Sequence, residues 1–83
     1  MAQVGSAPVS GLINELEVER RLPPLALRKA LRVSAGVSQQ RLADELRVHR
    51  ITVARWELGR RTPRGEHLRR YVSLLEGLRE ISS

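Results

Sequence analysis

Residues 38–59 read SQQRLADELRVHRITVARWELG, and this stretch decides the fold. Apolar residues recur at helical spacing in its first part, which predicts a short helix over residues 39–46. The next three residues, 47–49, leave room only for a tight turn. A second short helix is predicted over residues 50–58, and Gly59 ends it because glycine readily adopts the left-handed conformation that closes helices.

The predicted helix 50–58 has two chemically different faces. On a helical wheel with about 100° per residue, Thr52, Val53 and Trp56 point to one side, which is expected to be buried. The opposite side carries arginine together with small or branched apolar residues and no acid, and its members are Arg50, Ile51, Ala54, Arg55 and Leu58. This arrangement is typical of a helix-turn-helix that inserts its second helix into a DNA groove.

The outer face of residues 50–58 suits the edges of base pairs in the major groove. Arginine binds guanine O6 and N7 through two hydrogen bonds, and aliphatic side chains contact the methyl group of thymine. We therefore expect Arg50 and Arg55 to contact guanines. Ile51 and Ala54 are expected to contact thymine methyl groups. The alternative is that one or both arginines contact only phosphate.

The positive charge of the chain is concentrated around this helix. The net charge is +6, and residues 47–70 contain eight arginines but only two acids, Glu57 and Glu66. A basic stripe confined to one segment indicates a polyanionic partner, although a solvated surface in an arginine-rich chain is the plainer interpretation. Trp56 and Tyr71 are the aromatic residues, whereas single-strand and RNA binders stack bases on several. Double-stranded DNA is therefore the expected partner.

Residues on both sides of helix 50–58 suit the DNA backbone. Gln39 opens the preceding helix, where its amide and the helix N-terminus can both meet a phosphate. Arg60 and Arg61 follow helix 50–58 and are placed to bind the same strand. His49 stands just before this helix, where it either contacts DNA or serves as a weak helix cap.

Glu57 is the one acid within helix 50–58 and lies at the edge of its buried side. An unpaired carboxylate in this place would repel DNA and lose hydration. Arg32, near the end of a helix predicted over residues 24–35, can neutralise it, which predicts a structural ion pair between Arg32 and Glu57. The alternative is a glutamate that faces solvent.

No residue pattern in the chain points to catalysis, a metal or a cofactor. Cysteine is absent, and His49 and His67 have no acidic or thiol neighbours at ligand spacing. The chain shows no catalytic triad, paired carboxylates or glycine-rich phosphate loop. Apolar runs are short, so neither a signal peptide nor a membrane span is predicted. We expect a cytoplasmic, nucleoid-associated protein that is not an enzyme.

Outside the central stretch, the chain divides into three parts. Residues 1–9 are small, uncharged and interrupted by glycine and proline, which predicts a flexible tail. Residues 10–22 are predicted to form an N-terminal helix capped by Ser10. Residues 23–83 form the predicted DNA-binding domain, so the whole chain is expected to be an all-α bundle of about five helices.

Two further helices complete the predicted domain. A helix over residues 24–35 opens at the proline pair, and its inward stripe is expected to be Leu27, Ala30, Leu31 and Ser34. A long last helix over residues 65–80 has a core stripe that consists of Leu68, Tyr71, Val72, Leu75 and Leu78. Leu74 and Ile81 begin a second stripe, which suits either the N-terminal helix or a second copy of the chain.

Residues 27–75 resemble the lambda-repressor/Cro-like family of helix-turn-helix proteins, often called the XRE type. The matching residues are Arg32, Gly36, Ser38, Gln39, Leu42, Ala43, Leu46, Val48, Thr52, Val53, Arg55, Trp56, Glu57, Gly59 and Pro63. The resemblance implies about five helices, major-groove docking of helix 50–58 and a homodimer on a palindromic operator. It also implies DNA contacts by the equivalents of Gln39, His49, Arg50, Ile51, Arg55 and Arg60, and in some members a buried Arg32–Glu57 pair.

The chain departs from the family pattern in three places. Arg47 stands where the turn usually has glycine, so its backbone is expected either to adopt the left-handed conformation or to take another path. His49 replaces the usual serine or threonine cap. No fifth helix follows residues 65–80, and the helix over residues 10–22 is expected to fill its place.

These features favour a sequence-specific transcriptional regulator, such as a repressor, of bacterial, phage or plasmid type. Two alternatives stay open. An antitoxin would bind a protein partner through the N-terminal or last helix as well as its own operator. A recombination or excision accessory factor would use the same fold to bend DNA.

Overall fold

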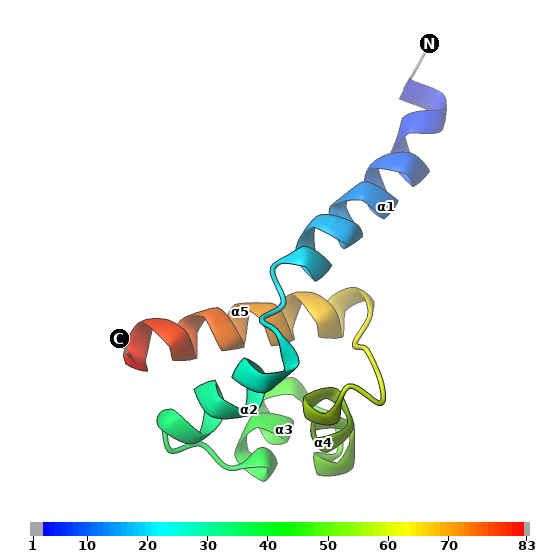
Figure 1. Cartoon of the computed structure of the whole chain (residues 1–83). Coiled ribbons are helices and arrows are strands. Elements are labelled where there is room, and N and C mark those ends of the chain that lie inside the picture. Colours follow the sequence, from blue (N-terminus) through cyan, green and yellow to red (C-terminus); the bar gives the residue numbers. More distant parts are fainter. Residues whose placement is uncertain (1–2, 83) are drawn as a thin grey trace.

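A computed structural model of the chain describes the backbone of residues 3–82 and the side chains of residues 11–82. The described residues form five helices and no strand, which confirms the predicted all-α class. They are α1 (Gln3–Arg20), α2 (Leu25–Ser34), α3 (Gln39–Leu46), α4 (Arg50–Leu58) and α5 (Gly65–Ser82). In Figure 1, α2, α3 and α4 lie together on one side of α5, whereas α1 extends away from the bundle.

The main core lies where α3 and α4 meet α5. Its buried residues lie on the faces that helical spacing predicted to point inward, and they are Leu42, Ala43, Leu46, Val53, Trp56, Tyr71 and Leu75. A smaller cluster joins α1 to α5 and contains Val18, Leu68 and Val72. α5 therefore supports both the helix-turn-helix and the N-terminal helix.

The inward face of α2 differs from the predicted stripe. Leu27 is 43 % exposed, and Ala30 and Ser34 are also exposed, so the prediction that these residues face the core was wrong. The buried residue of α2 is Arg32, and Arg28 lies half-buried one turn before it. Leu31 does pack against the main core as predicted. The inward face of α2 is shifted toward Arg28 and Arg32 because both guanidinium groups have hydrogen-bond partners there.

Both arginines of α2 satisfy backbone carbonyl groups of neighbouring segments. Arg28 donates from Nε to the carbonyl oxygen of Pro23 at 2.8 Å and from Nη1 to that of Trp56 at 3.2 Å. Arg32 donates from Nη1 to the carbonyl oxygen of Val37 at 2.8 Å. Guanidinium groups have the five donors and the long apolar stem that such a position needs.

α1 begins at Gln3, well before the Ser10 cap that the sequence predicted. The tail predicted over residues 1–9 is therefore corrected to helix from Gln3 onward, and residues 1–2 lie outside the described residues. Glycine and proline in this stretch suggested a break. Extending an existing helix is easier than starting one, because each added residue gains a hydrogen bond without a new nucleus.

The second apolar stripe predicted on the last helix divides into two parts. Leu74 packs against the main core, whereas Ile81 is 76 % exposed near the end of α5. α1 instead contacts α5 through Val18, which is buried against Leu68 and Val72. The N-terminal helix thus uses the first stripe of α5, beside the core of the bundle.

The ends of the central helices follow the chemistry expected from the sequence. The Ser38 hydroxyl accepts a 3.0 Å hydrogen bond from the backbone N–H of Arg41 and caps α3. Arg47 ends α3 with a φ of 59°, the left-handed conformation, which is one of the two possibilities expected at this turn. His49 precedes α4 without a side-chain capping hydrogen bond.

Replacing Arg47 with glycine is expected to stabilise the fold by about 0.5–1 kcal/mol. A non-glycine residue in the left-handed region costs about 1–2 kcal/mol, of which part is offset by the greater freedom of glycine in the unfolded chain. Urea unfolding of Arg47→Gly measures the gain. Arg47→Ala is the control, because alanine keeps the backbone penalty, and equal stability of the two variants would contradict this assignment.

Tyr71 carries a buried hydroxyl that lacks a hydrogen-bond partner among the described residues. A buried unsatisfied polar group costs about 1–3 kcal/mol. Tyr71→Phe is therefore expected to raise the free energy of unfolding at neutral pH by about 1 kcal/mol. Thermal or urea unfolding of the two proteins measures this difference, and a clearly less stable variant would show that the hydroxyl has a partner in solution.

The same side chain predicts a loss of stability in alkali. Burial raises the pKa of Tyr71 to about 12. The unfolded chain releases this proton at a lower pH than the folded protein does. The free energy of unfolding is therefore unaffected by this group below about pH 10 and falls as the pH rises toward 12. Tyr71→Phe should flatten the fall, which unfolding at pH 9 to 12 would reveal.

Candidate nucleic-acid interface

α4 presents the two faces that its sequence predicted. Val53 is fully buried and Trp56 is 4 % exposed, because both pack against the core. On the opposite face Ile51 is 52 % exposed, and Arg50 and Arg55 are exposed beside it. The chain therefore holds a basic helix face outward by burying the tryptophan behind it.

The other residues expected at DNA lie around this face. Ala54 is half-buried between the exposed side chains of α4. His49, Arg60 and Arg61 are exposed at the two ends of the helix, and Gln39 is half-buried at the start of α3. The structure thus brings the predicted base-contacting and backbone-contacting residues to one side of the molecule.

The loop after α4 folds back against the end of that helix. The backbone N–H groups of Arg60 and Arg61 donate to the carbonyl oxygen of Arg55 at 2.9 and 3.4 Å. Gly59 makes this turn with a φ of 75°, and a Cβ on it would lie 2.6 Å from Cδ1 of Leu25. The backbone conformation favours glycine, whereas the exposed Leu25 side chain could move to admit a Cβ. The turn keeps the two loop arginines close to α4.

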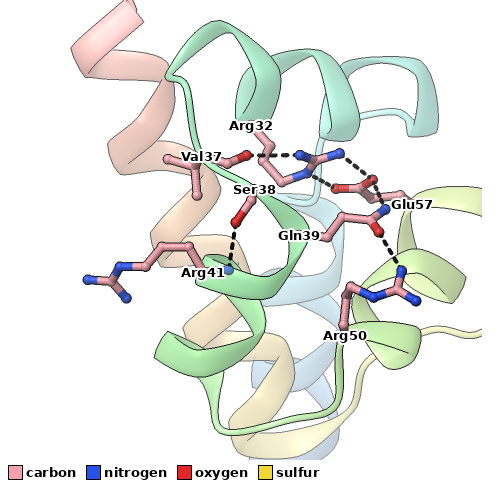
Figure 2. A network of polar contacts seen from close by, with 7 residues as sticks. All are labelled: Arg32, Val37, Ser38, Gln39, Arg41, Arg50 and Glu57. Carbon is pink, nitrogen blue, oxygen red and sulfur yellow. Dashed lines mark hydrogen bonds and ion pairs between the residues drawn. The ribbon is translucent and has the colours of Figure 1, made fainter.

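A polar network connects α2 to the exposed end of α4. Arg32 donates from Nε and Nη2 to the two carboxylate oxygens of Glu57 at 2.6 and 3.1 Å. The Gln39 amide nitrogen donates to the same carboxylate at 2.9 Å, and its oxygen accepts a 3.2 Å hydrogen bond from Arg50. Figure 2 shows these residues as one continuous chain, which also reaches the carbonyl group of Val37.

The inner part of this network is shielded from water. The side chains of Arg32 and Glu57 are 9 % and 3 % exposed. Their bidentate geometry satisfies both charges, which is needed because an unpaired buried charge is strongly unfavourable. The bond to Glu57 holds the Gln39 amide in place, and the amide oxygen in turn accepts a hydrogen bond from Arg50. The guanidinium of Arg50 is thereby oriented through the buried pair.

Two hollows flank Arg55 on the outer side of α4. The larger, about 740 Å³, has four arginines and no acid in its lining; these are Arg55, Arg60, Arg61 and Arg64. The other, about 660 Å³, is lined by His49, Arg50 and Ile51 among others. The smaller hollow also includes Asp44, so the basic concave surface that favours the approach of a phosphate group is the larger one.

Sequence reasoning missed two features of this surface. Thr52 was placed on the buried side of α4, but it is half-buried and lines both hollows. Its wheel position, at the boundary between the two faces, indicated this. The hydrogen bond that Gln39 donates to Glu57 and the one that it accepts from Arg50 were also missed, because they depend on the angle between α3 and α4.

Residues 11–82 contain no group of three or more side chains suited to hold a metal ion. Within the described part of the chain, no helix has the length and apolar character needed to cross a membrane.

The fold and the exposed basic helix define a helix-turn-helix DNA-binding regulator. Residues 29–79, more than half of the chain, match the family model described as Helix-turn-helix. The chain belongs to this family, the XRE or lambda-repressor-like type, as the residues of the central stretch indicated. No curated protein and no solved structure matches the chain.

Proposed function

We propose that this protein is a sequence-specific transcriptional regulator of bacterial, phage or plasmid type that places α4 in the major groove of duplex DNA. One observation carries the proposal: Trp56 is buried while Arg50, Ile51 and Arg55 are exposed on the opposite face of α4. An α-helix fits the major groove, and this face has the side chains that distinguish base pairs there. Binding to chromosomal DNA would place the protein at the nucleoid in the cytoplasm.

Specific contacts are assigned to the outer face of α4. Arg50 and Arg55 form hydrogen bonds with guanines. Ile51 and Ala54 contact the methyl groups of thymines. The hydrogen bond from Arg50 to Gln39 supports this assignment, because a guanidinium held in one orientation loses less freedom on binding a base. Arg55 has no comparable support and depends on its position on the helix.

Backbone contacts are assigned to the ends of the motif. The N-terminus of α3 at Gln39 offers free N–H groups and a favourable dipole to one phosphate. His49, Arg60 and Arg61 are exposed around α4 and supply further contacts. Phosphate contacts position the helix, and base contacts select the sequence.

Salt should weaken DNA binding strongly. With four to six phosphates neutralised per site, the slope of log affinity against log salt concentration is expected to be about −4 to −5. Replacing both Arg60 and Arg61 with alanine should reduce the magnitude of the slope by about 2 and weaken binding to all DNA sequences to a similar extent. Fluorescence anisotropy across a salt series measures both slopes, and an unchanged slope would remove these arginines from the phosphate contacts.

Selection of bound sequences from a random duplex library tests the proposed function as a whole. The expected result is an enriched site with guanines and thymines at the positions under α4, repeated as a palindrome where two copies bind. Binding without enrichment of any sequence would reject a sequence-specific regulator. A bend at the bound site with no effect on a nearby promoter would favour a recombination accessory factor instead.

A further inference from the structure

α1 is only partly covered by the rest of the chain. Figure 1 shows that it reaches the bundle with its C-terminal end and extends away from it. Val18 is buried there, but Leu12 is 58 % and Leu16 is 48 % exposed. Helices in proteins gain most of their stability from packing an apolar face. The apolar face of α1 therefore needs more cover than α5 gives.

The exposed leucines of α1 border a groove of about 310 Å³. One wall of the groove is α1, where Leu12 and Leu16 lie one turn apart. The other wall is the segment that leads into α5, with Pro63 and Leu68. Pro63 and Leu68 are buried, so the accessible apolar surface of the groove is the ridge formed by Leu12 and Leu16.

The two walls of this groove carry opposite charges. Glu15 and Glu19 line it from α1, and Arg64 lines it from the other wall. Among the ion pairs of the described residues, none involves these three side chains. A surface with an acidic wall, an apolar centre and a basic wall is complementary to itself after a two-fold rotation.

We propose that two copies of this chain pair through this groove, with the Leu12 and Leu16 ridge of each copy seated on the apolar surface of the other. The two-fold arrangement places Arg64 of one copy near Glu15 and Glu19 of its partner. It buries apolar residues that one chain leaves exposed. α1 lies outside the matched family region, residues 29–79, so this interface uses an element that is additional to the family domain.

Charge-reversed variants of the full chain test the pairing directly. The first variant carries Glu15→Arg and Glu19→Arg, and the second carries Arg64→Glu. Each should self-associate about tenfold or more weakly than the wild type, because two attractions across the interface become repulsions. An equimolar mixture of the two should dimerise again, since each partner then meets opposite charge. Sedimentation equilibrium measures the masses, and circular dichroism verifies that each variant is folded.

A matched control separates this groove from other apolar surfaces. Leu16→Asp should produce a monomer, whereas Ile81→Asp, at an exposed residue near the far end of α5, should leave the dimer unchanged. A mixture of the charge variants that stays monomeric would overturn the proposal. A wild-type chain that is monomeric at about 0.5 mM would also overturn it, whether or not that chain binds a different protein. DNA binding does not enter this test, so its failure leaves the proposed function standing.

Discussion

Glu57→Ala is expected to reduce the free energy of unfolding by about 3–5 kcal/mol. The substitution leaves the Arg32 guanidinium in a site that is nearly closed to water, without the carboxylate that neutralises it. It also removes the acceptor of the Gln39 amide. Small domains are stable by about 5–15 kcal/mol, so this loss removes a large part of the total stability. Urea unfolding followed by circular dichroism measures the change.

A double variant distinguishes a charge effect from a packing effect. Arg32→Met with Glu57→Met removes both charges and keeps apolar volume, and it should recover most of the stability lost in Glu57→Ala. Glu45→Ala is the matched control, because Glu45 forms an exposed ion pair with Arg41 on α3 and should cost less than about 1 kcal/mol. Equal losses from Glu57→Ala and Glu45→Ala would show that the buried pair does not hold the fold.

Arg50→Ala and Arg55→Ala are each expected to weaken binding to the selected operator by about 1–3 kcal/mol. Each loses two hydrogen bonds to a guanine, so the preference for guanine at one position should disappear as well. Binding to unrelated duplexes should change much less, because it depends on total charge. Anisotropy titrations with the operator and with single-base variants measure both quantities.

The control for these variants removes an arginine that lies away from the outer face of α4. Arg41→Ala deletes the same charge from α3, where Arg41 is exposed and paired with Glu45. Arg41→Ala should weaken binding to the operator and binding to unrelated DNA by similar, small amounts. Unchanged operator binding by both Arg50→Ala and Arg55→Ala would contradict the assignment of α4 as the base-reading helix.

The sequence predicted α3 and α4 with their observed bounds, because local chemistry determines them. Ser38 caps the first, Gly59 ends the second, and apolar residues at helical spacing give each helix one buried side. The left-handed conformation of Arg47 is one of the two possibilities that the family's glycine at this place implied. For this stretch, tertiary structure and local preference agree.

Elsewhere the sequence was insufficient, and the reasons are physical. The Arg32–Glu57 pair was predicted, but the hydrogen bond from Arg28 to the carbonyl oxygen of Trp56 was not, and hydropathy alone placed Leu27 on the inward face of α2. The start of α1 was missed because Gly5 and Pro8 are strong helix breakers, and Pro8 supplies no backbone N–H to the helix that the structure nevertheless shows there. The link from Gln39 to Arg50 required the angle between two helices, which no local pattern contains.

The hydrogen-bonded chain from Arg32 to Arg50 has a consequence for retargeting the protein to new operators. Arg50 is connected to the same carboxylate that neutralises a charge in the interior, whereas Ile51 and Arg55 stand free of it. Exchanging the residue at position 50 therefore removes a side chain whose orientation is set by Gln39, while the buried Arg32–Glu57 pair stays in place. Libraries that aim at a new target sequence should vary positions 51, 54 and 55 first and keep position 50 as a fixed anchor.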